Sequence, residues 1–154
     1  MGKGKGKGFH KSGNVPASEQ AAWIEMRWGK SWRVTGRGLN LVAEGLVRPA
    51  EICAEYKIRI SYDGGRPIVT VLDPPLKKRP GNGRIEHTYD NERLCLYYPG
   101  RGEWTPKKLL ANTVIPWISE WLYHYETWLA MGEWTGGGEH PVNKEELRAS
   151  GDGE

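Results

Sequence analysis

Two cysteines occur in this chain of 154 residues, and the surroundings of one of them suit a nucleophile. Cys95 follows a polar stretch that contains His87 and precedes the run YYPG (97–100). A thiolate attacks acyl donors, and a cysteine with the ordinary pKa of about 8.5 already has some thiolate at neutral pH. An activated donor, such as an adenylate or a thioester, therefore needs no strong base. Most free cysteines are small buried residues, so spacing alone leaves both interpretations of Cys95 open.

The residues that follow Cys95 would let a narrow ligand approach it. Glycine in the run PGRG (99–102) permits close passage of an extended peptide, and Arg101 can pair with a carboxylate. Cys53 has no comparable neighbourhood, so we interpret it as structural. His140 stands before a proline in a polar segment, and we expect no catalytic role for it.

The composition argues against several other classes of site. The two Cys and four His never fall at the tight spacing of metal ligands, so we expect no metal and no cofactor. The sequence has neither an apolar run of about twenty residues nor a signal-peptide core, so we expect a cytoplasmic protein with free thiols. The net charge is +3 with mixed signs, so nucleic-acid binding, suggested by the N-terminal Gly-Lys run and the eight Trp, is only a third hypothesis.

The first element that must position Cys95 is a helix near the N-terminus. Segment 18–30 predicts this helix, with Ser18 as its cap, Glu19 near its positive end and Gly29 at its end. Its apolar side is formed by Ala22, Trp23 and Met26.

Three strand-like segments follow, at 39–47, 55–63 and 66–75. The run DGG (63–65) predicts a hairpin turn between the last two, and Pro74-Pro75 ends the third. The middle segment alternates well, which indicates a strand with one buried face. That apolar face is made of Tyr56, Ile58, Ile60 and Tyr62.

The second half of the chain predicts a long irregular loop followed by helices. The loop carries Cys95, and the run RLCLYY (93–98) could form a short strand within it. Thr105-Pro106 predicts a helix start with an interruption near Pro116, and segment 117–132 predicts a second helix. One face of this second helix is formed by Trp117, Trp121, Tyr125 and Trp128. We interpret this face as core rather than as a partner groove, and we expect Gly132 to end the helix.

Strands and helices are segregated along the chain, which predicts an α+β fold. We expect one domain over residues 17–141. A disordered Gly/Lys tail is expected over 1–16, and a polar tail with a possible short helix at 143–149 is expected over 142–154.

The order of these elements resembles the ubiquitin-conjugating-enzyme fold, which has an N-terminal helix, an antiparallel four-stranded meander, a cysteine loop and C-terminal helices. Its histidine before the cysteine, its Cys-Leu pair and its following tryptophan match His87, Cys95-Leu96 and Trp104. The chain is more closely similar, over about residues 20 to 141, to a short stand-alone bacterial branch found in cyclic-oligonucleotide antiphage signalling (CBASS) operons. The shared motifs are DPP (73–75), HTY (87–89), LCLY (94–97), EW (103–104), PW (116–117), EWL (120–122), YE (125–126), WL (128–129), GEW (132–134), GGG (136–138) and HP (140–141).

This resemblance implies a cysteine acyltransferase. Cys95 would take the C-terminus of a cGAS-like nucleotidyltransferase as a thioester and pass it to an amine, which primes cyclic-nucleotide signalling. The chain has no room for an adenylating domain, so an activating enzyme is a further possible partner. Two alternatives stay open, which are a non-catalytic binding module of the same fold and a conjugating enzyme for a separate bacterial ubiquitin-like protein.

The resemblance also suggests roles for the residues around Cys95. Eukaryotic members have His-Pro-Asn where this chain has HTY (87–89), so the oxyanion role of that Asn is unassigned here. The Tyr89 hydroxyl, Asn91 and backbone N–H groups are candidates for it. We expect His87 to hold the loop by hydrogen bonds rather than to act as a base. The candidate contacts of the partner's tail are Tyr97, Arg101 and Trp104.

Overall fold

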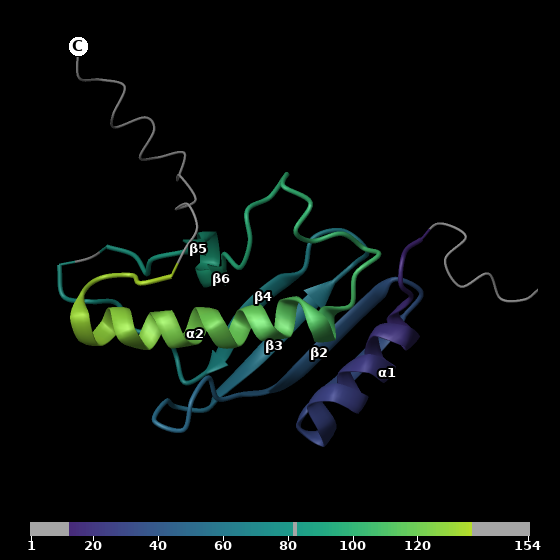
Figure 1. Ribbon diagram of the computed structural model, residues 1–154, viewed down its shortest axis with the longest axis horizontal. Helices are drawn as coiled ribbons and strands as arrows, with labels where there is room; N and C mark the ends of the chain where they lie inside the picture. The colour runs from purple at the N-terminus through teal and green to yellow at the C-terminus, as the bar shows by residue number, and fades with distance from the viewer. Residues whose placement is uncertain (1–12, 82, 137–154) are drawn as a thin grey trace, which may run out of the picture.

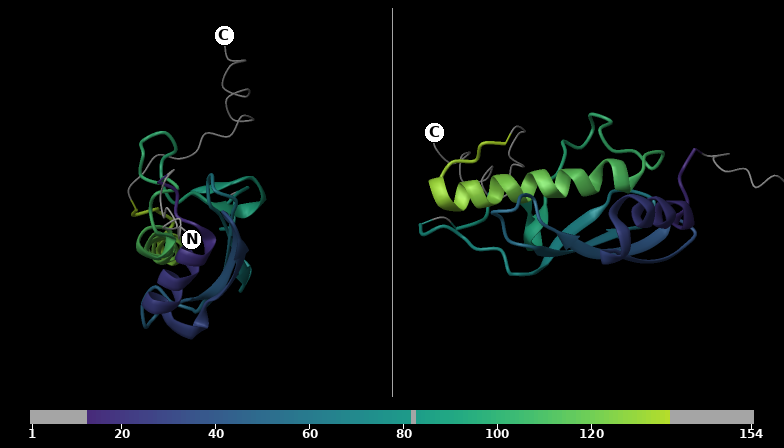
Figure 2. Two further views of the ribbon diagram at one scale, coloured as in Figure 1. Left: turned by 90° about the vertical axis from the view of Figure 1, so that its right-hand side faces the viewer. Right: turned by 60° about the horizontal axis from the view of Figure 1, so that its bottom comes forward.

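A four-stranded antiparallel sheet with helices on one face forms the body of the protein (Figures 1 and 2). The computed structural model describes residues 13–81 and 83–136. The sheet has the order β1-β2-β3-β4, and helices α1 and α2 lie against it. The bounds are α1 (Ala17–Trp28), β1 (Arg33–Arg37), β2 (Asn40–Val47), β3 (Tyr56–Tyr62), β4 (Ile68–Asp73), β5 (Thr88–Tyr89), β6 (Arg93–Leu94) and α2 (Val114–Met131). This arrangement confirms the predicted α+β fold with a four-stranded meander.

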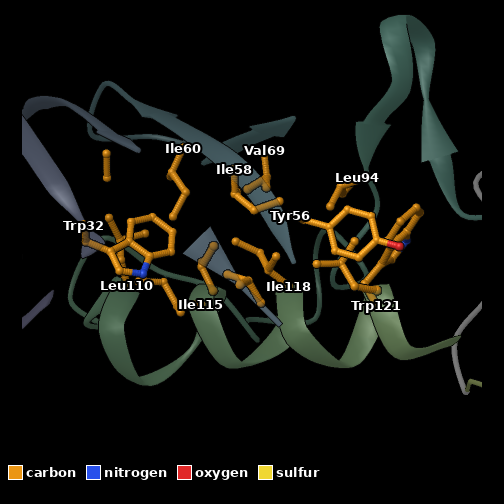
Figure 3. Close-up of a cluster of buried hydrophobic side chains, with 14 of the residues drawn as sticks. Trp32, Tyr56, Ile58, Ile60, Val69, Leu94, Leu110, Ile115, Ile118 and Trp121 are labelled. Atoms are coloured by element: carbon orange, nitrogen blue, oxygen red, sulfur yellow. The ribbon is translucent and has the colours of Figure 1, made fainter. Parts of the chain in front are cut away.

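The core lies between the sheet and α2 (Figure 3). The alternation predicted for β3 is confirmed, because its side chains are buried at every second position from Tyr56 to Tyr62. On α2, Trp121, Tyr125 and Trp128 are buried as predicted, whereas Trp117 is half-buried. Burial of one such side chain contributes roughly 1.5–3 kcal/mol, so this layer dominates the stability of the domain.

Helix α1 buries a different side from the one predicted. Trp23 and Met26 are exposed, and the helix starts at Ala17 after Pro16 with no side-chain cap, so the predicted apolar side and the Ser18 cap are both wrong. The buried positions are Ala17, Gln20 and Ile24. Gln20 explains this choice, since its side chain accepts the N–H of Leu110 at 2.9 Å and donates to the carbonyl of Lys108 at 3.0 Å.

Strand β1 had no counterpart among the predicted strand segments. It pairs with β2 from Arg33↔Glu44 to Arg37↔Asn40 and is mostly exposed. An exposed edge strand with a glycine has no alternating apolar pattern, so periodicity could not reveal it.

The predicted helix from Pro106 is wrong. The chain instead passes through turns and a short 3-10 helix (Leu110–Asn112), and α2 begins at Val114. Pro116 therefore lies in the first turn of α2, where its missing N–H breaks no intrahelical hydrogen bond. Gly132 ends α2 as predicted, with a left-handed φ of 89° and its N–H donated to the carbonyl of Trp128 at 2.8 Å.

The two predicted tails lie mostly outside the described residues, as do the possible helix at 143–149 and His140. Val15, within the predicted N-terminal tail, is buried, and its N–H donates to the carbonyl of Pro106 at 2.9 Å. Among the described helices, none has the length and apolar character that a membrane span requires.

Candidate active site around Cys95

A two-stranded hairpin positions Cys95. Strands β5 and β6 pair antiparallel, with Thr88 opposite Leu94 and Tyr89 opposite Arg93. Cys95 directly follows β6, and its N–H donates to the carbonyl of His87 at 2.9 Å. The hairpin lies beside α2 in Figure 1, and Leu94 points into the same end of the core as Trp121 in Figure 3. A backbone hydrogen bond directly after β6 thus holds the cysteine, which itself lies outside the strand.

The thiol of Cys95 has two close polar neighbours. Its Sγ lies 3.4 Å from the hydroxyl of Tyr89 and 3.8 Å from the carbonyl oxygen of Tyr97. Burial raises the pKa of this thiol, and the hydrogen bond with Tyr89 and the positive charge of Arg66 offset part of that rise. The thiol is therefore mostly protonated at neutral pH, so acyl transfer through it would require a donor that is already activated.

Tyr89 remains a hydrogen-bond donor over the whole physiological range. Burial raises the pKa of its hydroxyl well above the ordinary value of about 10, and the neighbouring Cys95 raises it further. A protonated phenol beside Sγ can donate to a thiolate or to an oxyanion that forms on the carbonyl being attacked.

His87 ties the hairpin to α2 through its backbone. Its carbonyl accepts the N–H of Cys95 and the indole N–H of Trp121, the latter at 3.0 Å. Its ring is buried and stacks on Trp134, with ring centroids 4.6 Å apart. Its φ of 52° lies in the left-handed region that a histidine rarely adopts. The carbonyl of His87 thus connects the hairpin to α2, and its ring contacts Trp134 beyond the end of that helix.

Two cavities lie beside the cysteine hairpin. A small one of about 90 Å³ is lined by Cys95 itself, together with His87, Leu96, Trp117, Glu120, Trp121, His124, Trp134 and Gly136. A larger one of about 440 Å³ is lined by Tyr89 and Tyr97, the two neighbours of Sγ. The remaining residues of the larger cavity are Asp63, Gly65, Arg66, Pro67, Ile68, Val69, Arg93, Leu94, Leu96 and Val114. Cys95 therefore lines the small cavity, and the hydroxyl beside its Sγ belongs to a residue of the larger one.

The other predicted site residues near the hairpin differ in how far they are buried and in what they contact. Tyr97 is half-buried and packs on Trp117, with ring centroids 5.6 Å apart. Asn91 is exposed in the turn between β5 and β6, with a φ of 61°. Arg101 is exposed and covers the ring of Tyr98, its Cζ lying 4.4 Å from the ring centroid.

Trp104 and Cys53 belong to the interior. Trp104 is buried against Tyr62 in an edge-to-face contact, and its indole N–H donates to the carbonyl of Gly65 at 2.9 Å. Cys53 is a buried free thiol whose pKa is raised by burial and by Glu126. Within residues 13–81 and 83–136, no three His, Cys, Asp or Glu side chains come together as a metal site.

The sequence did not indicate that Arg66 and Trp134 lie beside the cysteine hairpin. Arg66 follows the predicted DGG turn, so it was read only as part of a hairpin. Trp134 lies beyond the end of α2 and reaches His87 only because Gly132 reverses the chain. In both cases a turn brings a residue to the site across the fold.

Comparison with known families agrees with this geometry. The family model described as "Type II CBASS E2 protein" matches residues 20–141, which include α2, both cysteines and the whole β5–β6 hairpin. The chain belongs to this family. The resemblance drawn from the sequence motifs is thereby confirmed. No match was found among curated proteins. As a type II CBASS E2 protein, the chain has the fold and the conjugation-type character of ubiquitin-conjugating enzymes.

Proposed function

We propose that this type II CBASS E2 protein is a cysteine acyltransferase that uses Cys95 as its nucleophile. The observation that carries the proposal is the position of Cys95, which lines a small cavity and whose Sγ lies 3.4 Å from the hydroxyl of Tyr89, a residue that lines a larger one. Family membership supports it, because Cys95 lies in the matched region. The acyl donor is the activated C-terminus of a cGAS-like nucleotidyltransferase, and the acceptor is an amine.

The reaction proceeds in two displacements. The Cys95 thiolate attacks the activated carbonyl carbon, the bond from that carbon to its leaving group breaks, and a thioester forms on Sγ. An amine then attacks the same carbon, loses a proton to solvent, and releases the Cys95 thiolate. The hydroxyl of Tyr89 donates a hydrogen bond to the oxyanion in each step. His87 keeps the hairpin on α2 throughout through its carbonyl.

Intact mass of the protein co-expressed with the nucleotidyltransferase of its operon tests this function. Wild-type protein should carry an adduct of the partner's mass that is lost on treatment with reductant. Cys95→Ser should carry an adduct that resists reductant, because an oxygen ester replaces the thioester. Cys53→Ala is the matched control and should behave as wild type, since Cys53 is buried away from both cavities. Absence of any adduct in wild type and Cys95→Ser would refute the proposal.

A binding module without catalysis is the second candidate. The raised pKa of Cys95 favours it, because burial leaves little thiolate at neutral pH. Under this alternative, Cys95→Ala would still bind the nucleotidyltransferase and would protect cells from phage as well as wild type does. Loss of protection in Cys95→Ala with intact binding would instead favour acyl transfer.

The identity of the donor is a separate question within the leading proposal. A conjugating enzyme could equally take the C-terminus of a separate ubiquitin-like protein. The mass of the reductant-sensitive adduct distinguishes the two donors directly, as does the gene neighbourhood.

A further inference from the structure

Arg66 lies in the turn between β3 and β4 and reaches the cysteine hairpin across the larger cavity. Its Cζ lies 5.8 Å from the ring centroid of Tyr89, and its positive charge offsets part of the rise that burial causes in the pKa of Tyr97. All three residues line this cavity. The guanidinium therefore lies over the ring of Tyr89, whose hydroxyl neighbours the thiol of Cys95.

The turn that carries Arg66 is fixed on both sides. The N–H of Gly65 donates to the carboxylate of Asp63 at 3.0 Å, and the carbonyl of Gly65 accepts the indole N–H of Trp104 at 2.9 Å. Pro67 follows and restricts the backbone of Arg66 to extended conformations. The buried Trp104 thus anchors the turn and aims Arg66 at the hairpin.

The backbone of the hairpin and the ring of Tyr89 are held by different contacts. The neighbouring backbone is held locally, because the Thr88 hydroxyl donates to the carbonyl of Ile85 at 2.7 Å and Arg84 donates to the carbonyl of Thr88 at 2.9 Å. These bonds fix the strand but not the direction of the Tyr89 side chain. Stacking of a planar guanidinium on an aromatic face restricts that direction and is a contact that a lysine ammonium reproduces only in part.

We propose that Arg66 is a positioning residue of the acyl transfer, which holds the ring of Tyr89 beside Cys95 and places a positive charge near the thiol. The proposal rests on the nucleophilic role proposed for Cys95. A nearby cation favours the thiolate over the thiol. The other ionisable groups that line the two cavities are Asp63 and Arg93 on the larger one and His87, Glu120 and His124 on the smaller one.

The proposal can be tested without any partner protein by measuring the rate at which iodoacetamide alkylates Cys95. This rate is followed by peptide mass over an experimental range of about pH 6 to 10. Arg66→Met should shift the rise of the profile to higher pH and lower the rate at neutral pH by about two- to fivefold, a modest effect because Arg66 is exposed and its charge is screened by water. Arg66→Lys should restore most of the rate. The matched control, Arg33→Met, removes an exposed arginine of β1 and should leave the profile unchanged.

A double variant separates positioning from charge alone. Arg66→Met should lower the alkylation rate less in a Tyr89→Phe background than in wild type, because the hydroxyl through which Arg66 acts is then absent. Equal effects in the two backgrounds would overturn the positioning role. A profile of Arg66→Met that superimposes on wild type, or an equal shift in Arg33→Met, would overturn the proposal as a whole.

The outcome is independent of the proposed function. A shifted profile without a partner adduct would support the role of Arg66 toward the thiol and refute the proposed acyl transfer. A partner adduct with an unshifted profile would support acyl transfer and refute the role of Arg66.

Discussion

The hydroxyl of Tyr89 lies 3.4 Å from Sγ of Cys95, although the two residues are six positions apart in the chain. The β5–β6 pairing creates this proximity, because Tyr89 sits opposite Arg93 and Cys95 follows two residues later. Tyr89 is the third residue of the run HTY (87–89), which the sequence resemblance matches with the His-Pro-Asn of eukaryotic members. A phenol whose pKa is raised by burial offers a neutral donor there at any physiological pH.

Tyr89→Phe should slow acyl transfer while preserving the fold. The substitution keeps the ring and removes only the hydroxyl, so the loss of one oxyanion donor should reduce single-turnover discharge of the thioester by roughly ten- to a hundredfold. Tyr98→Phe is the control, because Tyr98 is exposed and lies outside both cavities. If Tyr89→Phe discharged the thioester at the wild-type rate, Tyr89 would not be the oxyanion donor. Asn91 or backbone N–H groups would then be the remaining candidates.

The rate of Cys95 alkylation should rise at a higher pH than the alkylation rate of a free cysteine. Burial raises its pKa, and Tyr89 and Arg66 only partly offset that rise, so the midpoint of the rate profile should exceed about 8.5. The same shift determines how stability depends on pH, because the thiol ionises at lower pH in the unfolded chain than in the folded protein. The contribution of Cys95 to the free energy of unfolding is therefore complete below about pH 8.5, and it is lost as pH rises through the pKa of the folded state. A rate that reaches its plateau below pH 8 would contradict the geometry.

Periodicity predicted the elements whose burial is regular. The alternation from Tyr56 to Tyr62 and the spacing of Trp121, Tyr125 and Trp128 each follow from one buried face, and both are confirmed. Helix α1 shows where this reasoning fails. Its buried face includes the polar Gln20, whose partners lie in a distant turn, while its largest apolar side chains are exposed.

The candidate site divides in the same way. A local motif singled out Cys95, and the resemblance added Tyr89, because both lie within one hairpin. Arg66 could not be predicted, since its direction depends on the hydrogen bond between Gly65 and the buried Trp104. Trp104 itself was expected to contact a partner, and only the folded structure shows that it packs on Tyr62. Long-range packing, rather than residue type, decides such positions.

Gln20→Ala should destabilise the domain strongly for an uncharged substitution. The fully buried side chain satisfies the N–H of Leu110 and the carbonyl of Lys108, so its removal leaves two backbone groups unpaired. The expected loss in free energy of unfolding is about 2–4 kcal/mol, which a urea titration measures. Glu25→Ala, at an exposed position of the same helix, is the control. A loss in Gln20→Ala no larger than in this control would show that α1 is not anchored through Gln20.

Trp121→Phe should both destabilise the domain and loosen the cysteine hairpin. The substitution removes the indole N–H that donates to the carbonyl of His87, together with part of a buried ring, at a cost of about 1–3 kcal/mol. His87 holds a left-handed φ of 52° that surrounding contacts must maintain, so losing one of them should free the backbone next to Cys95.

Two measurements check this coupling between α2 and the hairpin. The urea midpoint of Trp121→Phe should fall, and alkylation of Cys95 at fixed pH should become faster because the half-buried thiol opens more often. Trp23→Phe is the matched control, since Trp23 is exposed on α1 and should change neither quantity. If Trp121→Phe were destabilised but its alkylation rate were unchanged, Trp121 would stabilise only the core. The hairpin would then be held without the hydrogen bond between Trp121 and His87.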